Sequence, residues 1–198
     1  MPRSSGKTRD QILEAAMDLA SVEGLEGLSI GRLARRVEMS KSGVIGHFKS
    51  KEDLQLETVR AAVGVFEAEV QAGVTAEPGL ARLRVLLERW TRHVASGRFS
   101  GGCFFWAASA EFDGRPGRVR DAVARATLHW LEQIVAEVRL AIRLGEIRSD
   151  EDPEQLAFEL HALVQEANWA RQLLDRSDAF DRARRGIERR LGQAEKSN

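Results

Sequence analysis

Basic side chains concentrate in residues 29–51, where they could bind the phosphates of a nucleic acid. The segment holds six lysines and arginines against one acid, Glu38, so its net charge is +5. The whole chain has 30 basic and 30 acidic residues, so the remainder must be acidic. A positive patch inside a neutral protein is typical of a surface that binds a polyanion. The basic residues are Arg32, Arg35, Arg36, Lys41, Lys49 and Lys51.

The same segment has the pattern of two short helices joined by a tight turn. Ser29 is a favourable N-cap, and the apolar residues after it recur at helical spacing. Ser40 can cap a second helix, which leaves only Glu38 and Met39 between the two. Such a pair predicts a helix-turn-helix, whose second helix enters the major groove of DNA. The apolar positions of the first helix are Ile30, Leu33, Ala34 and Val37.

Charge alone leaves alternatives open. A run of basic residues is more often a solvated helical face than a binding site, and here the helix-turn-helix spacing favours DNA. Near the N-terminus, Arg3, Lys7 and Arg9 form either a frayed end or a basic arm that settles on DNA.

Length and composition predict an all-helical protein. A chain of 198 residues, 43% of them hydrophobic, can bury a core, and it has few prolines and no alternating apolar and polar runs. No stretch of about eighteen apolar residues or of signal-peptide type occurs, so we expect a cytoplasmic protein without a membrane segment. The single cysteine, Cys103, excludes an internal disulfide and a multi-cysteine zinc site, and no cofactor is expected.

Helical periodicity continues beyond the basic segment. Ser50 opens a long helix that we expect to reach about Gly73. Residues 103–108 are apolar all round, which predicts that they are buried in the core or line a cavity. Asp152 and Pro153 form a strong helix start, and residues 194–198 are expected to lack fixed structure. Further helices are expected over residues 8–24, 80–96, 118–145, 153–174 and 179–191.

Residues 8–54 resemble the tetracycline repressor (TetR) family of bacterial transcription regulators. The resemblance rests on a helix that ends near Gly24, on the helix-turn-helix and on the sequence HFKSKEDL at residues 47–54. Residues 101–103 and 111–117 also look like the C-terminal domain of one subset of the family. The resemblance implies a homodimeric, ligand-responsive repressor with DNA-binding residues 1–50 and a helical effector-binding and dimerisation domain over 51–198.

Two departures from the family pattern bear on DNA binding. Glu38-Met39 stands where Gly-Val or similar is usual, and a left-handed Glu38 would cost on the order of 1 kcal/mol. Ile45 stands where the family commonly has a tyrosine that contacts a phosphate. Gly43 and Gly46 lower the helix propensity but let the backbone approach the groove.

The resemblance assigns roles within the helix-turn-helix. Residues 41–43 are expected to face base edges, whereas residues 47, 49 and 51 face phosphates. Lys51 also lies in the first turn of a helix, whose N–H groups attract a phosphate. Val44 and Phe48 should pack inward because they are apolar. The predicted DNA-binding residues are Ser29, Lys41, Ser42, Gly43, His47, Lys49 and Lys51.

Large aromatic residues concentrate after Pro78, where all four tryptophans lie. They form either an ordinary aromatic core or the lining of a pocket for an apolar or aromatic effector. Cys103 is either a sensor thiol with a lowered pKa or a small buried hydrophobe. The predicted ligand-binding residues are Trp90, Cys103, Phe104, Phe105, Trp106, His129, Trp130, His161, Asn168 and Trp169.

The last two expected helices have wide apolar stripes and should form the dimer interface, with Trp169 of a type enriched there. Two-fold symmetry would then place two recognition helices ~34 Å apart on a palindromic double-stranded operator. Effector binding releases DNA only if it favours a different dimer geometry.

Two other functions compete with this one. A small-molecule enzyme is disfavoured because the candidate residues form no recognisable catalytic motif. A helical dimer that has lost operator specificity stays open because of Ile45 and the two glycines near it. The candidate residues for catalysis are His93, His129, His161, Glu111 and Cys103.

Overall fold

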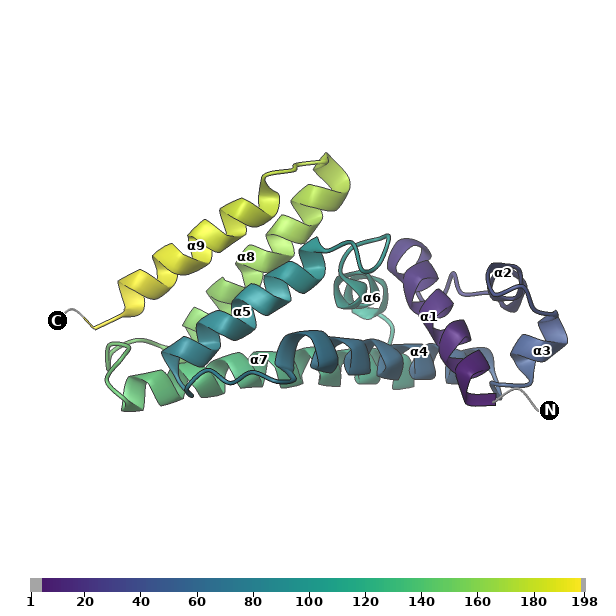
Figure 1. Ribbon diagram of the computed structural model, residues 1–198, viewed down its shortest axis with the longest axis horizontal. Helices are drawn as coiled ribbons and strands as arrows, with labels where there is room; N and C mark the ends of the chain where they lie inside the picture. The colour runs from purple at the N-terminus through teal and green to yellow at the C-terminus, as the bar shows by residue number, and fades with distance from the viewer. Residues whose placement is uncertain (1–4, 197–198) are drawn as a thin grey trace. The chain divides into compact units, whose positions relative to one another are not determined.

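The computed structural model describes residues 5–196, with side chains from residue 9 onward, and confirms the all-helical fold (Figure 1). Arg3 and the side chain of Lys7 lie outside this part of the chain. Within it there is no strand, and one isolated antiparallel bridge joins Ile147 to Glu195. In chain order the helices are α1 (Ser5–Glu23), α2 (Ile30–Arg36), α3 (Lys41–Ile45), α4 (Lys51–Phe66) with a π-helical continuation η1 (Glu67–Gln71), α5 (Leu80–Ala95), α6 (Phe104–Phe112), α7 (Arg118–Arg143), α8 (Pro153–Leu174) and α9 (Ala179–Ala194).

Packing divides the chain into two compact units. The first unit joins the described residues up to Val65 with Gly97–Ala126, and the second joins Phe66–Ser96 with the described residues from Thr127 onward. The helix-turn-helix therefore shares its unit with most of α4, with α6 and with the start of α7. This division by contacts does not coincide with the functional boundary predicted at residue 50.

The first unit is built around α1. Ile12 and Ala16 of α1 have no exposed surface, and they belong to one core cluster with α2, α3, α4 and α6. Val22 at the end of α1 is 61% exposed. Arg9 does not extend as an arm, because it forms an ion pair with Glu57 of α4 and lies over the Phe48 ring.

The turn between α1 and α2 is fixed by side chains from two other helices. Gly24 ends α1 with a left-handed φ of 77°, which leaves the following N–H groups without helical acceptors. The Glu111 carboxylate of α6 accepts these donors, from Leu25 at 2.6 Å and from Glu26 at 3.1 Å. From α4, the buried Gln55 side chain donates to the Leu25 carbonyl at 3.0 Å. A Cβ at Gly24 would lie 2.6 Å from Glu111 Oε2, so only glycine permits this approach.

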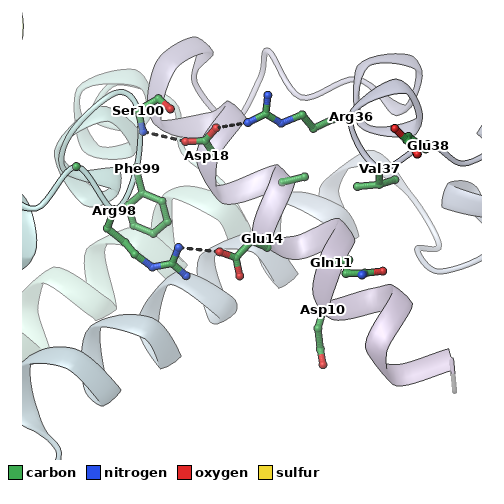
Figure 2. A pocket seen from close by; sticks show the side chains of 12 residues that line it. Asp10, Gln11, Glu14, Asp18, Arg36, Val37, Glu38, Arg98, Phe99 and Ser100 are labelled. Atoms are coloured by element: carbon green, nitrogen blue, oxygen red, sulfur yellow. Dashed lines mark hydrogen bonds and ion pairs between the residues drawn. The ribbon is translucent and has the colours of Figure 1, made fainter.

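The connection between α5 and α6 is bonded to α1 (Figure 2). Asp18 accepts the Ser100 N–H at 2.8 Å, and the Ser21 hydroxyl accepts the Gly101 N–H at 3.0 Å. A Cβ at Gly101 would come within 1.9 Å of the Ser21 carbonyl oxygen, so glycine is required there. Four acids and two arginines line the surface cavity of about 720 Å³ beside this connection, so its charge does not suit a phosphate backbone.

The second unit packs α5, α8 and α9 together with η1 and the remainder of α7. Asp152 caps α8, because its carboxylate accepts the N–H groups of Glu154 and Gln155, and Pro153 follows as predicted. The end of the chain is more ordered than its composition indicates. Lys196 donates its N–H to the Glu146 carbonyl at 3.1 Å, so the expectation for residues 194–196 is wrong.

Replacing Glu111 by alanine should destabilise the first unit. Two hydrogen bonds to a charged acceptor are lost, and the partly buried N–H group of Leu25 is left unsatisfied, so we expect a loss of roughly 2–3 kcal/mol in the free energy of unfolding. Urea denaturation measures it. The matched control is Glu14→Ala, which removes the exposed ion pair of Glu14 with Arg98 and should cost less than about 1 kcal/mol. Equal losses in both variants would contradict the role of Glu111.

Candidate nucleic-acid interface

The predicted helix-turn-helix is present, and both serine caps are confirmed. The Ser29 hydroxyl accepts the N–H of Arg32 at 3.3 Å, and the Ser40 hydroxyl accepts that of Gly43 at 3.0 Å. Glu38 lies between them with φ 53°, so it takes the strained left-handed conformation that its position in the turn requires.

Helix α3 has one buried side and one exposed side. Val44 is completely buried and Phe48 is 6% exposed, which confirms the prediction that both pack inward. Lys41, Ser42 and Ile45 are exposed. The Lys41 chain lies against α2, since its Cε would be 3.4 Å from a Cβ built at Gly31. A small exposed side of this kind can face a base-pair edge, while the buried side holds α3 to the unit.

Three of the six cations in residues 29–51 are bound by acids of the same unit. Arg32 forms an ion pair with Glu23 and Arg36 one with Asp18, both acids of α1. Lys51 Nζ lies 2.9 Å from Glu26 Oε2. Among the described residues, the other three have no acid within ion-pair distance, and all are exposed: Arg35, Lys41 and Lys49. The unneutralised positive charge of this segment therefore lies on three side chains and not on all six.

Lys51 is more constrained than its predicted role requires. Its ammonium donates to the Glu26 carbonyl at 2.7 Å as well as to the carboxylate. The hydrogen bonds from Lys51 and then from Gln55 hold the pKa of Glu26 below its usual value, so the pair stays ionised at neutral pH. An ammonium has three N–H donors, and Glu26 takes two of them. One donor remains for a phosphate.

The start of α4 follows the Ser-x-x-Asp pattern of a capping box. Ser50 Oγ accepts the Asp53 N–H at 3.0 Å, and the Asp53 carboxylate accepts the Lys49 N–H at 3.0 Å. These bonds fix the backbone that carries Lys49, whose ammonium stays exposed. His47 is partly buried, with its ring 6.4 Å from that of Phe48.

The ten predicted ligand-binding residues do not share one compact unit. Residues 103–106 lie in the first unit, and the six others lie in the second. Cys103, Phe104 and Ala108 are buried, but Trp106 is 39% exposed, so core burial does not hold for the whole of residues 103–108. Burial raises the pKa of the Cys103 thiol, which overturns the sensor alternative and confirms a buried hydrophobe. His129 is exposed, and Trp169 is 38% exposed.

An aromatic cluster forms in the second unit. Trp90 stacks on His161 with ring centroids 5.1 Å apart, and it meets Trp130 edge to face at 5.4 Å. Phe66 meets Trp130 on another side at 5.1 Å. The Trp130 indole nitrogen and Gln165 Oε1 are buried, and neither has a hydrogen-bond partner among the described residues. A buried unpaired donor and acceptor are expected where a ligand group supplies the missing partner.

Phe66 and Gln165 were not predicted as site residues. Gln165 Nε2 lies 3.3 Å from His161 Nε2, one helical turn away on α8, so their i, i+4 spacing was the available signal. Phe66 joins the cluster through the tertiary fold, and no local pattern indicates that.

In the described part of the chain, no group of three or more His, Cys, Asp or Glu residues could hold a metal ion. No helix there is long and apolar enough to cross a membrane.

Models of two bacterial regulator domains match the chain. The one described as "Bacterial regulatory proteins, tetR family" matches residues 12–58. The one described as "Tetracyclin repressor-like, C-terminal domain" matches residues 79–187, which is more than half of the chain. The HTH-type transcriptional regulator AcrR of Shigella flexneri is 33% identical over 84 residues. That match spans 41% of this chain and only 39% of the relative.

Solved structures share the fold over nearly the whole chain. A TetR transcriptional regulator from Chloroflexus aurantiacus J-10-FL has a TM-score of 0.87 at 23% identity, covering 96% of both chains. A putative transcriptional regulator from Saccharomonospora viridis, in complex with choline, has a TM-score of 0.82 at 24% identity, covering 98% of this chain and 100% of that one. AibR, in complex with isovaleryl coenzyme A and operator DNA, has a TM-score of 0.74 at 22% identity, covering 94% and 97%. The helix-turn-helix lies within the matched residues 12–58, and helices of the second half lie within the matched residues 79–187. The chain therefore belongs to the TetR family of bacterial transcription regulators.

Proposed function

We propose that this chain is a homodimeric repressor that binds a palindromic operator through α3 and is released by a small apolar or aromatic effector. The observation that carries the proposal is the set of three exposed cations of the helix-turn-helix segment that have no acidic partner in the described chain: Arg35 of α2, Lys41 of α3 and Lys49 after it. Phosphate contacts by such cations supply most of the affinity for DNA, and base-edge contacts supply the sequence preference.

Within this proposal the helix-turn-helix residues divide their roles. Lys49 and Arg35 bind phosphates, and Lys51 adds its remaining N–H donor. Ser42, which is exposed, faces a base edge, and the backbone at Gly43 approaches the groove beside it. Ser29 and His47 lie at the margins of this surface. The Ser29 hydroxyl uses its oxygen to cap α2 and keeps its hydrogen for a phosphate.

A second copy of the chain is the proposed partner of α8 and α9. Phe158, Leu173 and Leu174 on α8 are 66%, 65% and 50% exposed. Single exposed apolar residues are ordinary, but several on one helix indicate an interface. A groove of about 450 Å³ runs between α8 and α9, and its rim carries both acids and arginines, so the same surface on a second copy can pair with it.

The proposed effector site is the aromatic cluster of the second unit. An apolar or aromatic molecule suits rings such as Trp90 and Trp130, and an acceptor atom on it would satisfy the Trp130 N–H. Asn168, which is 1% exposed, is a further polar group in the core of the same unit. Two structural neighbours bind choline and isovaleryl coenzyme A, the second together with operator DNA. We extend this combination of effector and DNA binding to the present chain, with an effector of different chemistry.

Replacing Lys49 by alanine should weaken binding to every DNA sequence alike. In a dimer each copy loses one phosphate contact, so the slope of log K against log salt should fall by about 1.8. Fluorescence anisotropy at several salt concentrations measures the slope. Arg36→Ala is the matched control, because Asp18 already holds that guanidinium and the slope should stay within error. A larger change for Arg36→Ala than for Lys49→Ala would overturn the assignment of the phosphate-binding cations.

Replacing Phe158 by aspartate should weaken the dimer. The change puts a charge into the centre of the proposed apolar interface twice, once from each copy, so the dissociation constant should rise by about 100-fold or more. Sedimentation equilibrium measures it. Leu128→Asp, at a leucine of α7 that is 55% exposed, is the control and should leave the dimer intact. A Phe158→Asp protein that stays dimeric at micromolar concentration would exclude this face.

Acidification should destabilise the second unit through His161. Burial lowers its pKa from 6.5 to about 4, so the unfolded chain binds a proton between these values and the folded chain does not. Stability from this group is complete above pH 6.5 and is lost as pH falls to 4, by about 3 kcal/mol at most. Denaturation of wild type and His161→Phe between pH 4 and 7 measures the difference, with His129→Phe as an exposed control. If the His161→Phe variant loses as much free energy of unfolding between pH 7 and pH 4 as wild type does, His161 is not the cause of the acid sensitivity.

A further inference from the structure

Ile45 is an apolar side chain on a surface that is otherwise polar and basic. It is 55% exposed at the last position of α3, although the neighbouring Val44 is completely buried. On a helix, residue 45 lies on the same side as residues 41 and 42, which are four and three positions earlier. Ile45 therefore shares the exposed side of α3 with Lys41 and Ser42.

Little in the chain covers this isoleucine. The next residue along the chain, Gly46, has no side chain that could cover it. A Cβ at Gly46 would make ordinary contacts with backbone oxygens at 3.5 Å and 3.6 Å, so no other side chain lies close to that position. The side chain of Ile45 has no hydrogen-bonding group, so it cannot bind a phosphate as a tyrosine at this position could.

We propose that Ile45 reads the C5-methyl group of a thymine in the major groove, so that it determines specificity for one base pair in each half-site. The inference rests on the proposed binding of operator DNA by α3. The thymine methyl is the one apolar group that the four common bases present on the major-groove edge. Its contact with Ile45 removes apolar surface from water on both partners. Lys41 and Ser42, on the same side of α3, supply polar contacts to the neighbouring bases or phosphates.

The test removes single methyl groups from the DNA. Selection from randomised duplexes with the full-length protein yields the operator, and each thymine of a half-site is then replaced by deoxyuridine in both halves. At one position, we expect wild type to lose about three- to fivefold in affinity per methyl, and about ten- to twenty-five-fold for the symmetrical pair. At that position, a 5-methylcytosine·guanine pair should bind more tightly than a cytosine·guanine pair by a similar factor.

Two variants assign the effect to the side chain. Ile45→Ala should bind the thymine and deoxyuridine operators equally, since an exposed residue can be shortened without loss of folding. Val22→Ala, at a valine of α1 that is 61% exposed, should keep the full methyl dependence. Methyl dependence that persists in Ile45→Ala would overturn the inference, because another residue would then read the thymine.

Other outcomes also decide the matter. A selected operator whose affinity depends on no methyl group, or one without thymine in its half-sites, would overturn the role of Ile45 while leaving operator binding intact. An equal loss of affinity for Ile45→Ala on the thymine and deoxyuridine operators leaves the methyl dependence intact, so it too would overturn the inference, and it would place Ile45 against the sugar-phosphate backbone. If selection enriches no sequence, the proposed function itself fails.

Discussion

The carboxylate of Glu111 is the interaction on which the DNA-facing surface most depends. Helix α1 must end at Gly24 so that α2 can begin, and the N–H groups exposed by that ending need acceptors. Glu111 supplies both acceptors from 85 and 86 residues further along the chain. The opposite side of the same turn is bonded to Gln55 and Lys51 of α4. The turn thus joins α1, α4 and α6 within one compact unit, and the helix-turn-helix follows directly from it.

This arrangement also determines which cations can meet DNA. Acids of α1 and of the turn bind Arg32, Arg36 and Lys51, so their guanidinium and ammonium groups stabilise the unit as well as the surface charge. Exposed pairs of this kind contribute little stability each, yet they hold long side chains in fixed positions. The cations that remain for phosphates are Arg35 of α2, Lys41 of α3 and Lys49, which follows α3. Affinity and specificity are therefore proposed to reside in neighbouring but different side chains.

Local signals in the sequence predicted the elements that position this surface. Ser29, Ser40 and Asp152 are caps because their side chains bond to N–H groups two or three residues away, an interaction that needs no tertiary information. Burial of Val44 and Phe48 followed from their apolar character. The exposure of Trp106 did not follow from its apolar character, since it depends on which helix covers which side of another.

Local sequence patterns, such as caps and apolar spacing, could not predict contacts between residues that are distant in the sequence. Nothing local indicates that Glu26 binds Lys51, or that Cys103 and Trp130 belong to different compact units. The predicted ligand set gathered all four tryptophans with Phe104 and Phe105, whereas the structure forms one cluster around Trp90 that includes Phe66. Aromatic residues far apart in sequence become neighbours only when helices pack, so composition alone could not separate them.

The ratio of affinities for specific and random DNA is the most direct measure of whether this chain is an operator-binding regulator. The full-length protein would be titrated into labelled DNA from the region flanking its own gene and into a random duplex of equal length, at the same salt concentration. We predict binding to one palindromic site, by two copies of the chain, at least about 1,000-fold tighter than to random DNA. Equal affinity for both duplexes would contradict the assignment of α3 as a sequence-reading helix.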